Sequence, residues 1–358
     1  MMDVFSIQSD YTFAAYLRRH LLWQRYYIEG FKKNPYFNCK AHSNTILPLI
    51  LYEHTRNLKL NQIIEKLLPR TGRVLGNRKW SIGAYTLTIN KKIYRIIIDA
   101  RDGKYIIETA YKWCDFYFKA NMWKDLQDKE KVFPIIYTNG IMNSRRQNYL
   151  ITLRKEPKTH DIVFINRIWM GNGKDKYAMP EHQVRLFETL ASLDCKKDLR
   201  AVFSEELPRP IAREYQKRLD NIGVTWSYKF VPPALLWRRI ARSKISLFRA
   251  GKFLCIPWRM NDFMAMGTAV VFDKAPYSQW PVPLEEGKHY VSCDCGLNED
   301  ESLPNEDCYE NIRNRITSLL NEPEKIEAIR ENNMAYFDNY ATPEKVAQYI
   351  LDTVRNNI

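Results

Sequence analysis

The sequence has no apolar run long enough to cross a bilayer. The stretch Ile46–Tyr52 comes nearest, but it is short and contains Pro48. Near the N-terminus, Asp3, Ser6 and Asp10 interrupt any apolar core of the kind that a signal peptide has. We therefore expect a cytoplasmic protein.

Cysteine and histidine patterns typical of metal sites are also missing. The seven cysteines include no CxxC pair, and the six histidines show neither HExxH nor HxH spacing. An odd number of scattered cysteines argues against a disulfide framework. Cys293, Cys295 and Cys308 lie near one another but lack a suitable set of further ligands. The sequence predicts no metal site.

Positive charge is the strongest compositional signal. The 55 Lys and Arg residues outnumber the 41 Asp and Glu residues, which gives a formal net charge of +14. This excess favours an anionic partner: nucleic acid, an anionic membrane surface or a phosphorylated substrate. The basic residues are spread along the chain, and no signature of a known nucleic-acid-binding module accompanies them. A basic nucleic-acid-binding protein without enzymatic activity remains the alternative interpretation.

The chain is long enough for two domains. Residues 1–158 mix helical and strand-like segments, and a polar, basic stretch over 138–160 is the best linker candidate. From 159 to 340, strands and helices alternate, which predicts a parallel sheet with right-handed crossovers. A last helix over 341–358, started by Thr342 and Pro343, is expected to pack back on the N-terminal domain.

Two local patterns stand out in the first domain. Ala84–Ile89 and Ile93–Ile98, separated by Asn90-Lys91-Lys92, predict a β-hairpin. The first forty residues interleave aromatic side chains with arginines, including Arg18 and Arg25. That pattern fits an interfacial helix at a membrane, although a surface helix packed on its own domain is the favoured alternative. Residues 44–70 also look helical.

The stretch Ser243–Asp273 is the first candidate for a functional site. Lys244–Phe248 predicts a strand, Trp258–Met266 a short helix ended by Gly267, and Thr268–Phe272 a buried strand. A helix that begins at the carboxyl end of a parallel strand is where α/β folds bind phosphates. The sequence therefore predicts an anion site at the start of this helix.

A motif in this stretch resembles a known family. Asp262-Phe263-Met264-Ala265-Met266-Gly267 has the acid-to-glycine spacing of the E-A-M-A-x-G motif in the donor-binding half of GT-B glycosyltransferases, group-1-like and exostosin-like. Arg259 precedes the acid by three residues, as in exostosin-like members. The segments EEGKHYVSCD and LLNEPEKIEAIRENNMAYF also resemble the family, so the resemblance covers about half the chain. The acid is Asp instead of Glu, Phe263 replaces Ala, and the upstream Glu of the E-x(7)-E pattern is missing. Reaction stereochemistry is therefore not carried over.

The resemblance implies an α/β fold of the GT-B class, with two Rossmann-like domains facing a cleft and an irregular N-terminal domain. Residues 1–158 would be the acceptor side, and residues 159–340 would bind the nucleotide sugar. The implied activity moves a hexosyl or related sugar from a nucleotide-sugar donor to a hydroxyl of a glycan or lipid-linked acceptor. Bacterial surface polysaccharide (capsule or lipopolysaccharide) or glycoconjugate synthesis would be its setting.

The resemblance also implies which partners to expect. GT-B enzymes hold phosphates with Arg, Lys and helix dipoles, so no metal and no other cofactor is expected. A peripheral position on the inner face of an anionic membrane would suit the cationic surface. Nucleic acid is not an expected partner. An inactive scaffold with this fold is a third interpretation.

Residue roles follow from the motif. Asp262, an acceptor-only group, is assigned to the ribose hydroxyls, and Arg259 to the diphosphate. A salt bridge between these two side chains on one helix face is the structural alternative. The further donor-binding candidates are Arg167, Arg249, Lys252 and Gly267.

If the enzyme inverts, its general base would have to come from the N-terminal half, on a loop that faces the cleft. Asp99 and Asp102 follow a buried strand and are the catalytic candidates, with Asp115 and Lys119 next in order. A turn or helix-capping role is the alternative for Asp99.

Overall fold

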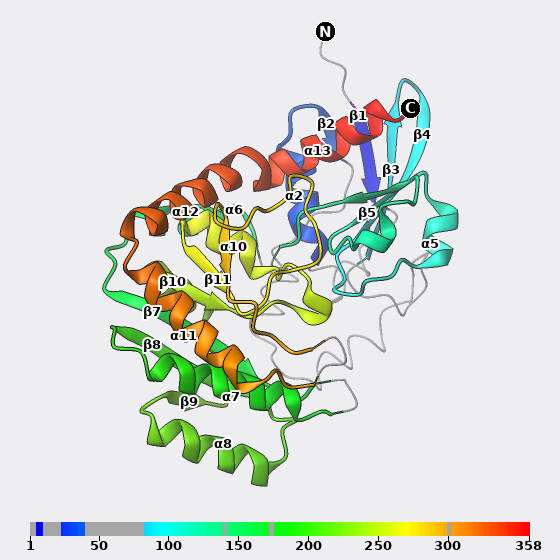
Figure 1. The fold of residues 1–358 in the computed structure, drawn as a ribbon. Helices are drawn as coiled ribbons and strands as arrows, with labels where there is room; N and C mark the ends of the chain where they lie inside the picture. Colours follow the sequence, from blue (N-terminus) through cyan, green and yellow to red (C-terminus); the bar gives the residue numbers. More distant parts are fainter. Residues whose placement is uncertain (1–4, 10–22, 40–81, 139–141, 172–174, 299–301) are drawn as a thin grey trace.

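A computed structural model of the protein describes residues 5–9, 23–39, 82–138, 142–171, 175–298 and 302–358. They form two α/β domains, each built on a six-stranded sheet (Figure 1). The helix expected over 44–70 and Arg18 of the aromatic stretch lie outside the described residues. No described helix is both long and apolar enough to cross a bilayer.

The N-terminal sheet is mixed, in the order β2-β1-β3-β4-β5-β6. β4, β5 and β6 are parallel neighbours, whereas β3 is antiparallel to both β1 and β4. The predicted hairpin is confirmed, with Asn90 and Lys91 at positive φ in its tight turn. The elements of this domain are β1 (Phe5–Ser9), α2 (Arg25–Lys33), β2 (Phe37–Cys39), β3 (Ile82–Ile89), β4 (Lys92–Asp99), α5 (Glu108–Trp113), β5 (Phe116–Lys119), β6 (Val132–Pro134) and α6 (Ser144–Thr152).

The C-terminal sheet is wholly parallel, in the order β12-β11-β10-β7-β8-β9. This is the strand order of a Rossmann fold. The predicted α/β class is confirmed by the topology of the two sheets, a Rossmann-like C-terminal sheet and an irregular, mixed N-terminal sheet. The strands are β7 (His160–Ile168), β8 (Lys197–Phe203), β9 (Thr225–Ser227), β10 (Ser243–Phe248), β11 (Ala269–Phe272) and β12 (Tyr290–Ser292).

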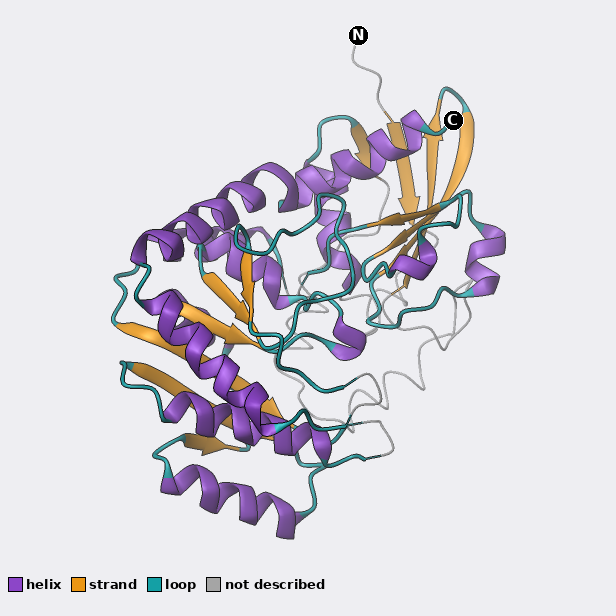
Figure 2. Ribbon diagram, in the orientation of Figure 1, coloured by secondary structure: helices purple, strands orange, loops and turns teal. Residues whose placement is uncertain are grey.

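Helices cover both faces of the C-terminal sheet (Figure 2). The sheet contributes to two apolar cores. One contains α7, α8 and α11, and the second contains α9 and α10. The helices are α7 (Ala178–Ala191), α8 (Arg209–Asn221), α9 (Pro233–Ala241), α10 (Arg259–Met266), α11 (Glu306–Leu320), α12 (Pro323–Tyr336) and α13 (Pro343–Asn356). The strand and helix predicted on either side of Arg249 are therefore confirmed.

The stretch expected to be a linker contains helix α6. Asn143 caps it by accepting a hydrogen bond from the backbone N–H of Arg146, at 2.9 Å. Leu150 and Gln147 are buried, and the helix contacts α10 of the C-terminal domain. The linker prediction was wrong because polar residues outnumber the few side chains by which this helix packs, so the stretch looks solvent-exposed in the sequence.

The core is continuous between the domains. A single cluster of buried apolar side chains includes Tyr85 and Ile96 of the N-terminal sheet, Met260 and Phe263 of α10, and residues of α13. Helix α13 returns to the N-terminal domain and lies against α2 (Figure 1). The two domains therefore share apolar surface that neither buries alone.

One disulfide joins Cys295 to Cys308. It ties the loop after β12 to the first turn of α11, which begins at Glu306. The remaining described cysteines outside β2 are free, so the sequence correctly argued against a disulfide framework but missed one bridge. The pair follows no spacing rule that could have revealed it.

Candidate active site

The strand order of the C-terminal sheet reverses between β7 and β10, and this is where Rossmann folds bind ligands, outside the carboxyl ends of the strands. The chain leaves β10 through Arg249, Ala250 and Gly251. Arg249 is half-buried, and the backbone N–H of Gly251 donates to the carbonyl oxygen of Cys255 at 3.0 Å. We call residues 249–255 the β10 loop.

The β10 loop holds an unusual backbone. Phe253 and Leu254 both adopt positive φ, 57° and 53°, which costs free energy for residues with side chains. Lys252 begins the short turn that contains them. Strain of this kind persists only where the surrounding structure imposes it, and it is frequent at functional sites.

Arg259 is the first residue of α10. Its guanidinium lies over the Trp258 ring, 5.1 Å from the centroid, and the described residues offer it no hydrogen bond or ion pair. Burial lowers the pKa of Arg259, while the charge of Asp262 acts in the opposite direction. A partly dehydrated cation without a paired carboxylate can bind an anion at a helix N-terminus.

Asp262 lies one turn further on, and its surroundings differ. The side chain is 1% exposed, and one carboxylate oxygen accepts a hydrogen bond from the indole N–H of Trp237 in α9, at 2.9 Å. The ribose role of Asp262 remains a prediction, and it requires the buried carboxylate to become accessible.

Gly267 takes the helix-ending position that the sequence predicted, and Arg167 lies inside a strand. Gly267 ends α10 in the left-handed conformation and packs against Met334 of α12, at the far end of the helix from Arg259. Arg167 lies within β7, not after it, because the strand runs on to Ile168. Its guanidinium donates to the Ser204 hydroxyl at 2.7 Å and lies over the exposed ring of Phe230.

In the N-terminal domain, Asp99 ends β4 and is fully buried. Arg101 donates to both of its carboxylate oxygens, Tyr117 donates at 2.6 Å, and the ammonium of Lys119 lies 3.5 Å away. Burial raises the pKa of Asp99, but Lys119 and Arg101 lower it further, so the net pKa is below the usual value. The Asp99 carboxylate is thus ionised, and both of its oxygens accept hydrogen bonds from neighbouring side chains.

Asp102 is exposed, in contrast. Burial and the charge of Asp102 raise the pKa of the nearby Tyr137 hydroxyl well above its ordinary value. Asp115 lies away from this region: it precedes β5, at the opposite end from Lys119, and accepts from the backbone N–H of Arg95. Of Asp99 and Asp102, the two candidates in this region, Asp102 is therefore the exposed carboxylate.

The two domains meet at these carboxyl ends. The Cys255 thiol of the β10 loop is within electrostatic reach of Asp102, Lys119 and Arg249. Met122, beyond β5, forms a bridge with Gln279, which also accepts a hydrogen bond from the Gln127 amide at 2.9 Å. The structure thus brings Asp102 and Arg249 to one region, as an inter-domain site requires.

Sequence reasoning missed a further buried carboxylate, that of Asp273, directly after β11. The signal was present, because an acid is an expensive residue to bury at the end of an apolar strand. Its contacts are described below.

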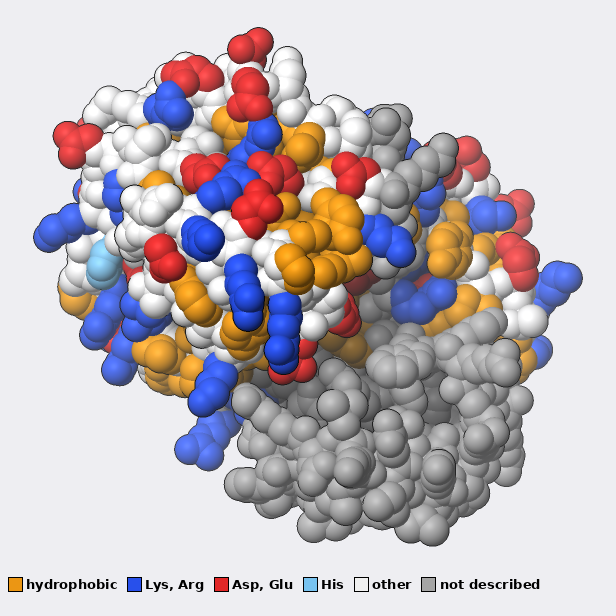
Figure 3. Space-filling view, turned by 90° about the horizontal axis from the view of Figure 1, so that it is seen from below, with side chains coloured by type: hydrophobic (Ala, Val, Ile, Leu, Met, Phe, Trp, Pro, Cys, Tyr) orange, Lys and Arg blue, Asp and Glu red, His pale blue; other side chains and the backbone are white. Residues whose placement is uncertain are grey.

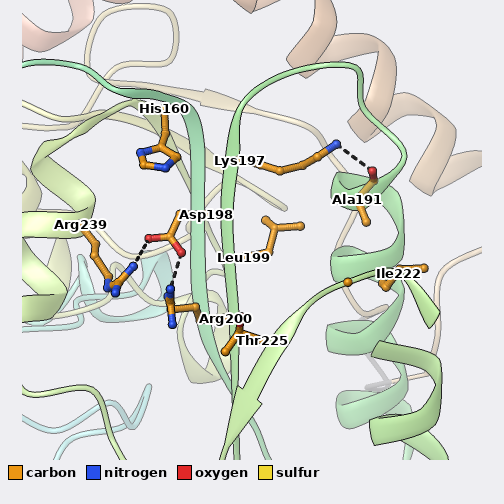
Figure 4. A pocket seen from close by; sticks show the side chains of 10 residues that line it. His160, Ala191, Lys197, Asp198, Leu199, Arg200, Ile222, Thr225 and Arg239 are labelled. Atoms are coloured by element: carbon orange, nitrogen blue, oxygen red, sulfur yellow. Dashed lines mark hydrogen bonds and ion pairs between the residues drawn. The ribbon is translucent and has the colours of Figure 1, made fainter. Parts of the chain in front are cut away.

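The described residues contain no group of three or more His, Cys, Asp or Glu side chains that could hold a metal ion. A cavity of about 310 Å³ lies at the opposite, amino edge of the C-terminal sheet (Figure 4). There Asp198 pairs with Arg200 and Arg239, at 2.8 and 2.7 Å. Its charges are thus largely occupied by one another.

No family model matches the sequence, and no curated protein is matched by it. Among solved structures, HepE of Anabaena in complex with UDP and glucose is similar at a TM-score of 0.45 and 14% identity, over 70% of this chain and 65% of HepE. The C-terminal domain of LpcC of Francisella tularensis, a group 1 glycosyltransferase, gives 0.35 and 15%, over 55% of this chain and 93% of LpcC. A glycosyltransferase of Rickettsia africae gives 0.41 and 11%, over 68% and 63%.

The chain thus covers less than two thirds of the HepE and Rickettsia africae structures. All three TM-scores are below 0.5, and the fold class of this chain is established by its own strand order.

Proposed function

We propose that the protein is a glycosyltransferase whose nucleotide-sugar donor binds between the carboxyl ends of the two sheets. The observation that carries this proposal is Arg259, a partly buried guanidinium at the start of α10 without a hydrogen bond from the described residues. It lies beyond the β10 loop, at the edge where a Rossmann sheet receives a nucleotide. A diphosphate supplies the negative charge that this site lacks.

In this proposal Arg259 and Arg249 bind the diphosphate; the side chain of Lys252, the other candidate in the β10 loop, lies outside what the structure describes. Their guanidinium groups stabilise the leaving group as its charge grows, so no metal ion is needed for that task. Arg167 lies at the carboxyl end of the neighbouring strand β7, across the reversal in strand order.

Asp102 is assigned as the general base of an inverting transfer. The acceptor oxygen bonds to the anomeric carbon while the bond from that carbon to the diphosphate breaks, and the acceptor proton passes to the Asp102 carboxylate. Asp102 is preferred to Asp99 because its side chain is exposed, whereas Asp99 is fully buried against Arg101 and Tyr117.

The acceptor is assigned as a glycan or lipid-linked hydroxyl, in surface polysaccharide or glycoconjugate synthesis. The net charge of +14 suits an anionic acceptor or membrane surface. Among the described residues on the face seen in Figure 3, blue and red side chains are interspersed.

The donor proposal is tested by calorimetric titration with UDP, GDP, CMP and dTDP. We expect one nucleotide to bind the wild type, and Arg259→Ala to weaken it about tenfold or more, since a charge-assisted contact is lost. Arg213→Ala, an exposed arginine of α8 on the other face of the sheet, is the matched control and should bind normally. If no nucleotide binds the wild type while oligonucleotides bind with steep salt dependence, the proposal is wrong.

The base is tested separately with the nucleotide sugar identified by that screen. Asp102→Asn should keep donor affinity and lose at least about 100-fold in turnover, the scale of general base catalysis. Retained turnover would exclude Asp102 and leave the donor assignment standing.

A further inference from the structure

Asp273 forms hydrogen bonds with the residues on both sides of Arg249. Its backbone N–H donates to the carbonyl oxygen of Phe248 at 3.2 Å, and its carboxylate accepts from the backbone N–H of Ala250 at 2.9 Å. The same carboxylate oxygen accepts from the N–H of Lys274 at 2.8 Å. One residue thus fixes the backbone immediately before and after Arg249.

The second carboxylate oxygen of Asp273 faces His182 of α7. The ring Nε2 lies 3.3 Å from it, and Nδ1 lies 2.9 Å from the Tyr309 hydroxyl of α11. All three side chains are buried. Burial raises the pKa of Tyr309, so its hydroxyl stays protonated. In one tautomer of the imidazole, the Tyr309 hydroxyl donates to Nδ1 while Nε2 donates to the Asp273 carboxylate.

Covalent and backbone links hold this chain of contacts at its outer end. Cys308, the neighbour of Tyr309, is bonded to Cys295, and the backbone N–H of Cys295 donates to the carbonyl oxygen of Asp273. Buried polar chains of this kind are rigid when every member has a partner. The backbone at the start of the β10 loop is therefore held in place ahead of the strained turn.

We infer that Asp273, oriented by His182 and Tyr309, is a positioning residue that holds Arg249 and the β10 loop toward the donor diphosphate. This inference rests on the proposed function. It assigns Asp273 no contact with substrate, because its side chain is 2% exposed and its oxygens face backbone and imidazole. Its effect reaches the ligand only through the residues on either side of Arg249.

The test compares affinities for UDP and for uridine, measured by calorimetric titration; if the screen identifies another nucleoside diphosphate, that compound and its nucleoside take their place. Loss of positioning should weaken UDP about tenfold in Asp273→Ala and leave uridine unchanged, since only the diphosphate lies against the loop. Asp273→Asn keeps an acceptor for the N–H of Ala250 and should recover most of the affinity. Tyr309→Phe removes one hydroxyl from the outer end and keeps a folded protein available if Asp273→Ala is unstable; we expect a loss of about threefold for UDP.

Asp198→Ala is the matched control, because it removes a nearly buried carboxylate with two ion pairs at the opposite edge of the sheet. It should lower the melting temperature without changing UDP affinity. The inference is overturned if Asp273→Ala and Tyr309→Phe bind UDP as the wild type does, or if Asp198→Ala weakens UDP equally. If the wild type binds no nucleoside diphosphate, the proposed function fails and the inference fails with it.

Discussion

At the scale of single residues, two carboxylates three positions apart have opposite surroundings. Asp99 is enclosed by Arg101, Tyr117 and Lys119, whereas Asp102 reaches the surface. The sequence proposed both as catalytic, because both follow the same strand. It could not separate them, since the distinction depends on side chains of β5, which pairs with β4 only in the folded sheet.

The Asp99 cluster predicts a measurable change in stability. Asp99→Asn leaves Lys119 and Arg101 without their carboxylate, and we expect a loss of about 3 kcal/mol in the free energy of unfolding at neutral pH. Urea denaturation provides the measurement. Tyr117→Phe, which removes one hydrogen bond and no charge, should cost about 1 kcal/mol.

The same cluster predicts a pH dependence. The pKa of Asp99 is lower in the folded than in the unfolded chain, so its stabilisation is complete above about pH 4, the ordinary carboxyl value, and declines as the pH falls below it. Between pH 5 and 3 the wild type should therefore lose stability more steeply than Asp99→Asn. Parallel curves for the two proteins would show that Asp99 does not titrate in this way.

At the scale of elements, a comparison of Gly267, at the end of α10, with Gly223 separates the cost of a left-handed backbone from the cost of a packing clash. Gly267 and Gly223 both have positive φ, 63° and 70°. A Cβ added at Gly267 would lie 2.6 Å from Cγ of Met334, whereas a Cβ added at Gly223 would have no other heavy atom within 4 Å. Gly223→Ala should cost about 1 kcal/mol for the left-handed conformation alone. Gly267→Ala should cost a further 1 kcal/mol or so because Met334 has to move.

Denaturant titration of the two glycine variants measures the difference directly. Equal losses would mean that α12 yields without cost, and that Gly267 is required only by its backbone. If the larger loss at Gly267 is accompanied by unchanged nucleotide affinity, Gly267 acts as the end of a helix and not as part of the donor site.

The sequence predicted elements well where apolar periodicity was strong, and missed those where it was not. The buried strand Ala269–Phe272 and the capped helix before it were placed within a residue or two. Helix α6 was missed because polar residues outnumber apolar ones in its sequence, SRRQNYLIT. The network of Asp273, His182 and Tyr309 joins residues 91 and 127 positions apart, which no local pattern encodes.

At the scale of the whole molecule, the contact of α2 with α13 unites the domains. A Cβ at Gly30 of α2 would lie 2.1 Å from the backbone oxygen of Pro343, so no other residue fits there without displacing the helix. Alanine normally stabilises a helix relative to glycine by about 1 kcal/mol. Gly30→Ala should instead destabilise the protein, by about 2 kcal/mol, through overpacking against backbone.

Because the apolar core is shared, this variant should lower one common transition. We expect calorimetry and tryptophan fluorescence to give a single coincident unfolding step in the wild type and in Gly30→Ala, at a lower temperature in the variant. Two separate steps, with only one of them shifted, would mean that the domains unfold independently despite the shared core.

The return of α13 to α2 also has a consequence for biosynthesis. Domains generally begin to fold in the order in which the ribosome releases them. Here the side of α2 that holds Tyr26 and Gly30 is completed by Ala341, Pro343 and Ala347, which the ribosome releases more than 300 residues later. A nascent chain therefore keeps this surface of α2 exposed until α13 has been synthesised. A chaperone that binds such surface would meet this protein through α2.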